Sequence, residues 1–281
     1  MEVPSLLEIA SEAVASYISD GYYENIDYNL SPAISNRVYP LIQKTNESLI
    51  QIQSKLNVTK MDILALDLDK DDRKMVKTQT LEALIFDISK QNKDYCTVTE
   101  NDEVRCDLFS LLTDILNNQT KENLKYLEIH FFVQPLVGWT RRIGRIIPNL
   151  QSLIIPGCQF IPQDFHYLCR NFPNLKILDI GASGIKSLNG ISILGNLEVL
   201  CIRDNEFQSS EDLLDLFGCE RLRMLDVSNV VSNPGVVANY LRAERSLKHL
   251  EFLDCTRTDI DRDMLYQLIG THRNLKQVVA H

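Results

Sequence analysis

The feature that most constrains the fold is a spacing of apolar residues that recurs along most of the chain. The pattern is Leu-x-x-Leu-x-Leu, with other apolar residues replacing leucine at some positions. Successive copies begin 26, 25, 22, 25, 25 and 28 residues apart. The seven copies are Leu124-Leu127-Ile129, Leu150-Leu153-Ile155, Leu175-Leu178-Ile180, Leu197-Leu200-Ile202, Leu222-Leu225-Val227, Leu247-Leu250-Phe252 and Leu275-Val278-Ala280.

This spacing has a direct structural meaning. The second and third apolar positions of a copy are two residues apart, so both point to the same face of a short strand. Stacked copies form a parallel sheet whose buried face is one leucine core, and repeats of about 20 to 29 residues are typical of leucine-rich repeats. We therefore expect an α/β fold: a leucine-rich-repeat solenoid with strands on the concave face and short helices on the convex face.

The domain limits follow from where the pattern starts. Two earlier copies are predicted, Met61-Leu64-Leu66 and Leu81-Leu84-Phe86, and a polar stretch at 90–105 is predicted to be an inserted surface loop. Helices are expected at 107–116, 164–168, 212–217 and 264–269, where apolar residues have helical spacing. We expect a helical cap at 1–55 and a repeat domain of about nine repeats at 56–281.

The cap is predicted to contain at least two helices. The first has one apolar stripe, formed by Leu6, Ile9, Ala10, Ala13, Val14, Tyr17 and Ile18. Ser5 and Glu8 have the spacing of a capping box at its start. The second helix is expected from Ser31-Pro32 to Ile42. Both helices can cover the exposed end of the solenoid, and the first can also present an outward face to a partner.

The residues flanking the strand leucines predict a charged concave face. Glu128, Asp179, Asp226 and Glu251 are expected in one column, with a neighbouring column of Lys and Arg residues. With Arg203, these four residues form the candidate partner face. The alternative is a solvated surface whose charges compensate one another, because opposite charges adjacent on a sheet need no ligand to explain them.

Composition excludes several partners. The net charge is −9 and the isoelectric point about 5.1, so the chain lacks the basic surface that binds nucleic acid. No apolar run is long enough to span a membrane, and the acidic start is unlike a signal peptide. The seven cysteines have no paired zinc-ligand spacing. We expect a cytoplasmic or nuclear protein with no membrane or nucleic-acid partner.

The sequence also predicts a protein that is not an enzyme. It has no Gly-x-x-x-x-Gly-Lys phosphate loop, no Gly-x-Ser-x-Gly elbow and no His-Glu-x-x-His zinc motif. The five histidines are scattered along the chain. We expect no catalytic residues, no cofactor and no bound metal.

The first helix resembles an elongin-binding box. That box has a small residue, a leucine, three residues, a cysteine or small substitute, three more residues and an aliphatic residue. Here Leu6 matches the anchor, Ala10 stands where cysteine is preferred, and Val14 is the aliphatic residue. The resemblance implies that Leu6, Ile9, Ala10 and Val14 contact elongin C.

The segment from Leu30 to Val38 is similar to the cullin-two box that follows an elongin box. That box normally starts with an aliphatic residue and a proline, whereas Ser31 separates Leu30 from Pro32 here, which leaves the choice of cullin open. The resemblance implies that Leu30, Pro32, Ile34 and Val38 contact cullin two.

Two such boxes before leucine-rich repeats resemble the N-terminal half of the Zyg-eleven and Zer-one family. Members are substrate-recognition subunits of cullin-two RING ubiquitin ligases, so the resemblance implies an adaptor that joins elongin BC and cullin two to an unknown protein substrate. The family's C-terminal armadillo-like repeats, which capture glycine-starting degrons, have no counterpart before His281. We expect a shortened paralogue or isoform, or a gene model that stops early, and do not carry degron recognition over.

Two other functions remain open at this point. One is an F-box-type adaptor of a Skp–cullin ligase, which the segment from Leu30 to Leu41 matches loosely. The other is a protein-binding repeat scaffold with no ligase link, in which the N-terminal helices are only a cap. The deciding feature is whether Leu6, Ala10 and Val14 face solvent or the repeat core.

Overall fold

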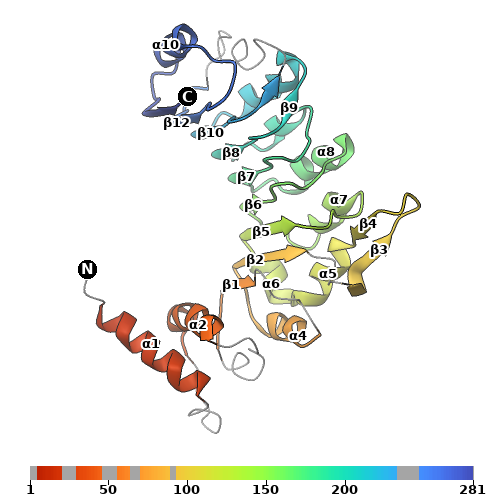
Figure 1. Cartoon of the computed structure of the whole chain (residues 1–281), viewed down its shortest axis with the longest axis vertical. Coiled ribbons are helices and arrows are strands. Elements are labelled where there is room, and N and C mark those ends of the chain that lie inside the picture. The colour runs from red at the N-terminus through yellow and green to blue at the C-terminus, as the bar shows by residue number, and fades with distance from the viewer. Residues whose placement is uncertain are drawn as a thin grey trace.

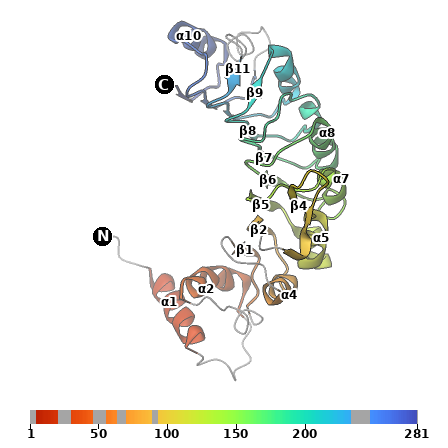
Figure 2. The same cartoon turned by 45° about the vertical axis from the view of Figure 1, so that its right-hand side comes forward.

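The computed structural model describes residues 5–20, 30–45, 56–63, 70–88, 93–232 and 247–280. The chain forms a crescent in which the strands line the inner side and helices cover the outer side (Figures 1 and 2). The N-terminal helices lie at one end of the crescent and the last repeat at the other.

The inner side is a nine-stranded sheet in which every neighbouring pair is parallel. The predicted α/β leucine-rich-repeat solenoid is therefore confirmed. The strands, in their order across the sheet, are β1 (Lys60–Ile63), β2 (Ala83–Ile88), β5 (Tyr126–Phe131), β6 (Ser152–Ile154), β7 (Ile177–Asp179), β8 (Val199–Cys201), β10 (Met224–Asp226), β12 (Phe252–Asp254) and β13 (Gln277–Val279).

The outer side is made of short helices. They are α4 (Lys70–Thr78), α5 (Leu108–Ile115), α6 (Asn118–Asn123), α7 (Trp139–Ile143), α8 (Pro162–Asn171), α10 (Arg262–Thr271) and the 3₁₀ helices η2 (Ile191–Ile193) and η3 (Ser210–Gly218). Beside them, β9 (Glu206–Phe207) pairs with β11 (Val231–Ser232).

The helix expected at 212–217 is a 3₁₀ helix. Leu213 and Leu216 are buried while Leu214 is exposed, and a period of three matches the three residues per turn of a 3₁₀ helix. Gly218 lies so close to η2 that a Cβ there would be 2.5 Å from the Cβ of Ser192. The tighter helix therefore fits a narrow space beside its neighbour.

The register of two repeats was predicted wrongly. Leu253 pairs with Leu225 and Val278, so the eighth copy is Leu250-Leu253-Cys255 rather than Leu247-Leu250-Phe252. Met61 pairs with Leu84, so the first copy is Val58-Met61-Ile63 rather than Met61-Leu64-Leu66, of which Leu64 and Leu66 lie outside the described residues. Each predicted copy is displaced by three residues from the copy in the structure. The displacement arose because another apolar residue three positions away also completes the Leu-x-x-Leu-x-Leu pattern.

The segment expected to be a loop at 90–105 has structure of its own from residue 93. It contains the 3₁₀ turn η1 (Lys93–Tyr95) and an antiparallel hairpin of β3 (Cys96–Val98) and β4 (Val104–Cys106). Its β4 end is held to the segment after β5, because the Cys106 N–H donates to the Gln134 carbonyl at 2.9 Å. The insertion is thus attached to the convex side.

A buried asparagine closes the turn after β8. Asn205 is 2% exposed, and its Oδ1 accepts from the backbone N–H groups of Ser183 and Ile185 at 3.2 and 3.1 Å. Its Nδ2 donates to the carbonyls of Ile180, Ile202 and Arg203 at 3.0, 2.9 and 3.2 Å. Asn205 stands where an Asn or Cys is usual in such repeats, three residues after the last apolar position.

The last described repeat contains a buried histidine that predicts a dependence of stability on pH. Burial lowers the pKa of His272 below its ordinary value of 6.5. The ring is neutral with its proton on Nδ1, because the Leu247 N–H donates to Nε2 at 3.4 Å and Nδ1 lies 3.0 Å from the Leu268 carbonyl oxygen.

Because its folded pKa is depressed, His272 takes up a proton more readily when unfolded as the pH falls below about 6.5. We expect urea unfolding to give a lower free energy of unfolding at pH 5.5 than at pH 7.5. His272→Gln is expected to flatten this dependence, and the exposed His249→Gln to leave it unchanged. Equal slopes for both variants would contradict the assignment.

Candidate protein-binding surfaces

The N-terminal part forms two helices, α1 (Leu6–Ser19) and α2 (Pro32–Thr45). The predicted capping box starts α1: the Ser5 N–H donates to Glu8 Oε2 at 2.6 Å, and the Glu8 N–H donates to Ser5 Oγ at 3.2 Å. The Ser5 backbone hydrogen bond holds the pKa of Glu8 below its usual value. The first turn of α1 is therefore fixed by its own side chains.

The two helices pack against each other (Figure 2). The buried residues of α1 are Ser11, Ala15 and Ile18, and Val14 is half-buried. The docked face thus contains only part of the predicted apolar stripe, Val14 and Ile18, and includes the polar Ser11. Its hydroxyl is satisfied inside the helix by donating to the Leu7 carbonyl at 2.7 Å.

Helix α2 closes the N-terminal end of the sheet through Asn36. Asn36 Oδ1 accepts from the backbone N–H groups of Thr59 and Lys60 at 2.9 and 3.2 Å, and its Nδ2 donates to Thr59 Oγ1 at 2.9 Å. Ser35 Oγ accepts from the Asn57 N–H at 3.1 Å. These bonds satisfy the exposed edge before and at the start of β1, so α2 acts as the cap of the solenoid.

The other side of α1 remains exposed and apolar. Ile9 is 51% exposed and Tyr17 49% exposed, and Ala10 and Ala13 are exposed beside them. Ile9, Ala13 and Tyr17 are four residues apart, so they form one continuous stripe. Of the residues predicted to contact elongin C, Ile9 and Ala10 therefore face solvent, Val14 is half-buried, and the side chain of Leu6 lies outside the described part.

The structure separates the four residues predicted to contact cullin two. Pro32 and Ile34 are exposed, and Leu30 is half-buried against the core. Val38 is fully buried, so its assignment as a surface contact is wrong. The reason is helical geometry: Ser35, Val38 and Ile42 are three or four residues apart and form the inward face of α2.

The concave face of the C-terminal repeats has three parallel rows of side chains. The middle row is Ile177, Val199, Met224 and Phe252, which pair from β7 to β12. The acidic row is Asp179, Cys201, Asp226 and Asp254, which pair in the same order. The charged row is Lys176, Glu198, Arg223, Glu251 and Lys276, which are joined through backbone hydrogen bonds.

This arrangement corrects one predicted site residue. Glu251 was expected in the acidic column, but Asp254 pairs with Asp226 there, and Glu251 lies opposite Arg223 in the charged row. The error follows from the three-residue shift of that repeat. Asp179 and Asp226 lie in the acidic row as predicted.

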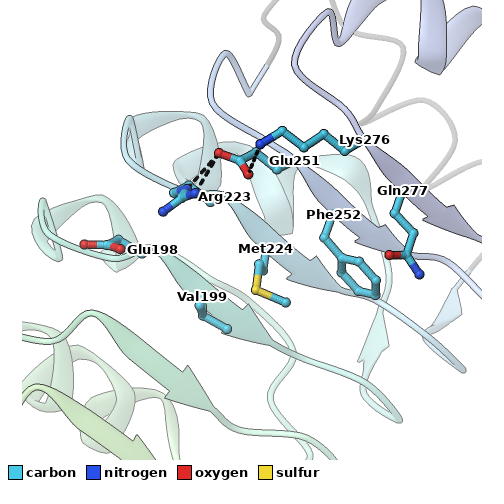
Figure 3. A pocket seen from close by; sticks show the side chains of 8 residues that line it. All are labelled: Glu198, Val199, Arg223, Met224, Glu251, Phe252, Lys276 and Gln277. Carbon is cyan, nitrogen blue, oxygen red and sulfur yellow. Dashed lines mark hydrogen bonds and ion pairs between the residues drawn. The ribbon is translucent and has the colours of Figure 1, made fainter.

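The charged row is compensated within itself. Arg223 Nε donates to Glu251 Oε1 at 2.9 Å, and Lys276 Nζ donates to Glu251 Oε2 at 2.8 Å (Figure 3). The hydrogen bonds from Lys276 and Arg223 lower the pKa of Glu251. Arg223 and Lys276 are largely exposed and Glu251 is half-buried, so water screens the network and it contributes little to stability.

The middle row is the part of the surface that the sequence analysis missed. Figure 3 shows Val199, Met224 and Phe252 side by side along one edge of a pocket. Met224 is 42% exposed, and Val199 and Phe252 are partly exposed. The available signal was an apolar residue directly before the paired leucine in four successive repeats: Ile177-Leu178, Val199-Leu200, Met224-Leu225 and Phe252-Leu253.

The carboxylates of the acidic row are oriented by the backbone. Asp179 accepts from the Gly181 N–H, Asp226 from the Ser228 N–H, and Asp254 from the Thr256 N–H, each at 2.9 Å through Oδ1. Cys201 Sγ lies 3.4 Å from Asp226 Oδ2. Three repeats therefore hold their carboxylates in the same way.

Of the two remaining predicted residues, Glu128 lies in the same column as the acidic row, because it pairs with Ile154 and Ile154 pairs with Asp179, whereas Arg203 lies outside the rows. Arg203 is exposed after β8, with its Cγ 2.8 Å and its Nε 3.1 Å from the position of a Cβ on Gly181. Glu128 lies on β5, where the Tyr126 hydroxyl donates to it and its Oε1 lies 2.8 Å from His130 Nε2. Glu128 is thus engaged by its own strand.

Within the described ranges, no three His, Cys, Asp or Glu side chains gather into a possible metal site. In the same part of the chain, no helix is both long and apolar enough to cross a bilayer.

Comparison with known proteins identifies a relative. No family model matches the chain. Gastrulation-defective protein 3 of Caenorhabditis elegans, a Zyg-eleven and Zer-one family member, is 38% identical over 283 aligned residues, which cover 97% of this chain. The resemblance to the Zyg-eleven and Zer-one family is confirmed. The chain spans 39% of the length of that relative, which fits the expected match to half of a family member.

Solved structures with lower similarity were also found. An internalin from Listeria monocytogenes is 15% identical with a TM-score of 0.43, covering 92% of this chain and 77% of that one. An internalin C2 from the same species is 15% identical with a TM-score of 0.45, covering 100% and 99%. The described parallel sheet and its repeat register themselves establish that the chain is a leucine-rich-repeat scaffold.

Proposed function

We propose that this scaffold is a substrate-recognition adaptor of a cullin-two–elongin BC ubiquitin ligase. In this role α1 docks elongin C, the start of α2 contacts cullin two, and the repeats bind a target protein. The observation that carries the proposal is the exposed apolar stripe of Ile9, Ala10, Ala13 and Tyr17 on a helix that is already docked by its opposite side.

The stripe has the properties of a helix-in-groove ligand. Such ligands present apolar anchors on one helical face to a hydrophobic groove of the partner. Ile9 and Tyr17 leave about half of their surfaces in water, which is unfavourable unless a partner covers them. Of the two residues with the elongin-type spacing, Ala10 belongs to this stripe and the half-buried Val14 lies beside it.

The cullin contact rests on fewer residues than the sequence implied. Pro32 and Ile34 are exposed at the start of α2 and are available to a partner. Val38 is excluded from this role by its burial, and Leu30 forms a bridge with Leu56 at the edge of the first repeat. We therefore assign the contact to Pro32 and Ile34.

A scaffold without a ligase is the competing function. In that case both helices would only cap the solenoid. The hydrogen bonds that close the sheet edge come from α2, through Ser35 and Asn36, whereas α1 packs mainly on α2. An apolar stripe on the far side of α1 has no purpose in capping, which favours docking.

The test is a pull-down with the whole chain. Wild type, Ile9→Lys/Ala10→Phe and the control Glu12→Ala, which changes an exposed polar residue of α1, are used to capture elongin C, cullin two and the Skp adaptor. We expect wild type and Glu12→Ala to capture elongin C and cullin two. The double variant should lose at least about tenfold in elongin C binding, because interface anchors contribute about 2 kcal/mol or more.

Circular dichroism would first establish that the double variant remains folded, as the exposure of both residues predicts. Capture of the Skp adaptor instead of elongin C would replace the proposal by the F-box alternative. Capture of none of the three by wild type would leave the scaffold function.

A further inference from the structure

The middle row is an apolar strip on the open side of a parallel sheet. Its four residues, Ile177, Val199, Met224 and Phe252, come from strands that are consecutive neighbours in the sheet. The convex face of the same sheet is covered by helices, whereas the described part of the chain places none over the concave face (Figure 2). Parallel sheets are usually covered on both faces, so this strip is suited to a partner.

The two rows that flank the strip differ in charge. On one side, Glu251 is bonded to both Arg223 and Lys276, so the charges are internally satisfied. On the other side, Asp226 and Asp254 lie directly opposite each other on paired strands. Like charges directly opposite on neighbouring strands are unfavourable.

No described cation compensates this pair of carboxylates through an ion pair. Each uses Oδ1 to accept a backbone N–H at 2.9 Å, and Cys201 Sγ reaches the second oxygen of Asp226. Arg203 is nearby, but it lies over Gly181 beside Asp179 rather than at the pair. The electrostatic field over this end of the strip is therefore negative on one side only.

We propose that the concave face from β7 to β13 binds an extended segment of a partner protein in which aliphatic residues alternate with lysine or arginine. An aliphatic side chain enters the pocket of about 280 Å³ beside Val199, Met224 and Phe252. Successive side chains of an extended segment that lies flat on the strip point to its two sides, so the adjacent basic side chain points to the acidic row and reaches Asp226 and Asp254. This inference rests on the protein-binding role of the scaffold and not on its link to a ligase.

The spacing of the rows fits such a segment. Neighbouring strands are about 4.8 Å apart, and alternate residues of an extended chain are about 6.6 Å apart. Three alternate side chains of a segment that runs across the strands span about 13 Å, which is close to the distance of about 14 Å from β7 across β8 and β10 to β12. An acidic segment would meet the carboxylates of the acidic row and be repelled.

The test uses three fluorescein-labelled peptides that differ only in charge: Val-Lys-Leu-Lys-Val-Lys, Val-Ser-Leu-Ser-Val-Ser and Val-Glu-Leu-Glu-Val-Glu. Fluorescence anisotropy with the full chain measures each dissociation constant at two salt concentrations. We expect the lysine peptide to bind at least about tenfold more tightly than the serine peptide, and the glutamate peptide not to bind.

Matched variants separate this site from general attraction to an acidic protein. The double variant Asp226→Asn/Asp254→Asn should raise the dissociation constant of the lysine peptide by about tenfold. Glu100→Gln/Asp102→Asn removes the same charge from the exposed hairpin turn and should leave binding unchanged. The apolar contact is tested by Met224→Ser, which should weaken the binding of both the lysine and the serine peptide. Val98→Ser, which changes a residue 67% exposed on the hairpin, should leave the binding of both unchanged.

Equal effects of the two charge variants, or equal binding of all three peptides, would overturn the inference. A chain that captures elongin C through α1 but binds none of the peptides would also overturn it, while leaving the adaptor proposal intact. Selective binding of the lysine peptide by a chain that does not capture elongin C would support the inference and contradict only the adaptor proposal.

Discussion

Replacing Asn205 by alanine is expected to lower the free energy of unfolding by about 3 kcal/mol or more. The substitution removes the acceptor for two backbone N–H groups and the donor to three carbonyls, all in a buried turn. A buried polar group that loses its partner costs about 1 to 3 kcal/mol, and several are affected here.

Urea denaturation followed by circular dichroism measures the loss, and hydrogen exchange locates it. We expect faster exchange in the turns after β7 and β8, which Asn205 joins. The control is Asn189→Ala, which changes an exposed asparagine in the connection between β7 and β8 and should alter the stability by less than about 0.5 kcal/mol. Equal stabilities of the two variants would contradict the role of Asn205.

Val38→Asp is expected to detach the α1–α2 pair from the first repeat. Val38 is 0% exposed on the inward face of α2, and an unpaired carboxylate there would be buried without a partner. Burial of this kind costs several kcal/mol, which exceeds what a short helical pair gains by docking. The remaining repeats are expected to stay folded, because each repeat contacts mainly its neighbours.

The matched control is Ile34→Asp, which introduces the same charge one turn earlier on the exposed side of α2. Hydrogen exchange should show loss of protection in α1, α2 and β1 for Val38→Asp and little change for Ile34→Asp. Retained protection in Val38→Asp, with loss of cullin two capture alone, would instead restore Val38 as a surface contact.

The repeat architecture could be predicted because its physical cause is simple. Every strand must bury the same two apolar positions, so a leucine spacing alone indicates the sheet and its order. The register of single repeats could not be predicted in the same way. Near Leu250 three apolar residues follow one another at intervals of three, and only the pairing of Leu253 with Leu225 decides which set is used.

The candidate surfaces were predictable in part. The capping box, the two helices and the exposed Ile9 and Ala10 follow from local pattern. The docked face of α1 does not, because its apolar residues span a wide arc and the small Ser11 lies in the interface. The middle row was missed because single apolar residues between leucines carry no periodic signal beyond that of the core.

The bonds of Asn36 to the residues that enter β1 give the N-terminal helices an influence beyond their own contacts. In a solenoid, stability passes from neighbour to neighbour, and the terminal unit frays first. A partner that clamps α1 would hold α2 and thereby slow the opening of β1, then β2, with an effect that fades along the crescent. Binding of a partner at one end would thus slow local opening in a graded way, most in the first repeats and least near Met224.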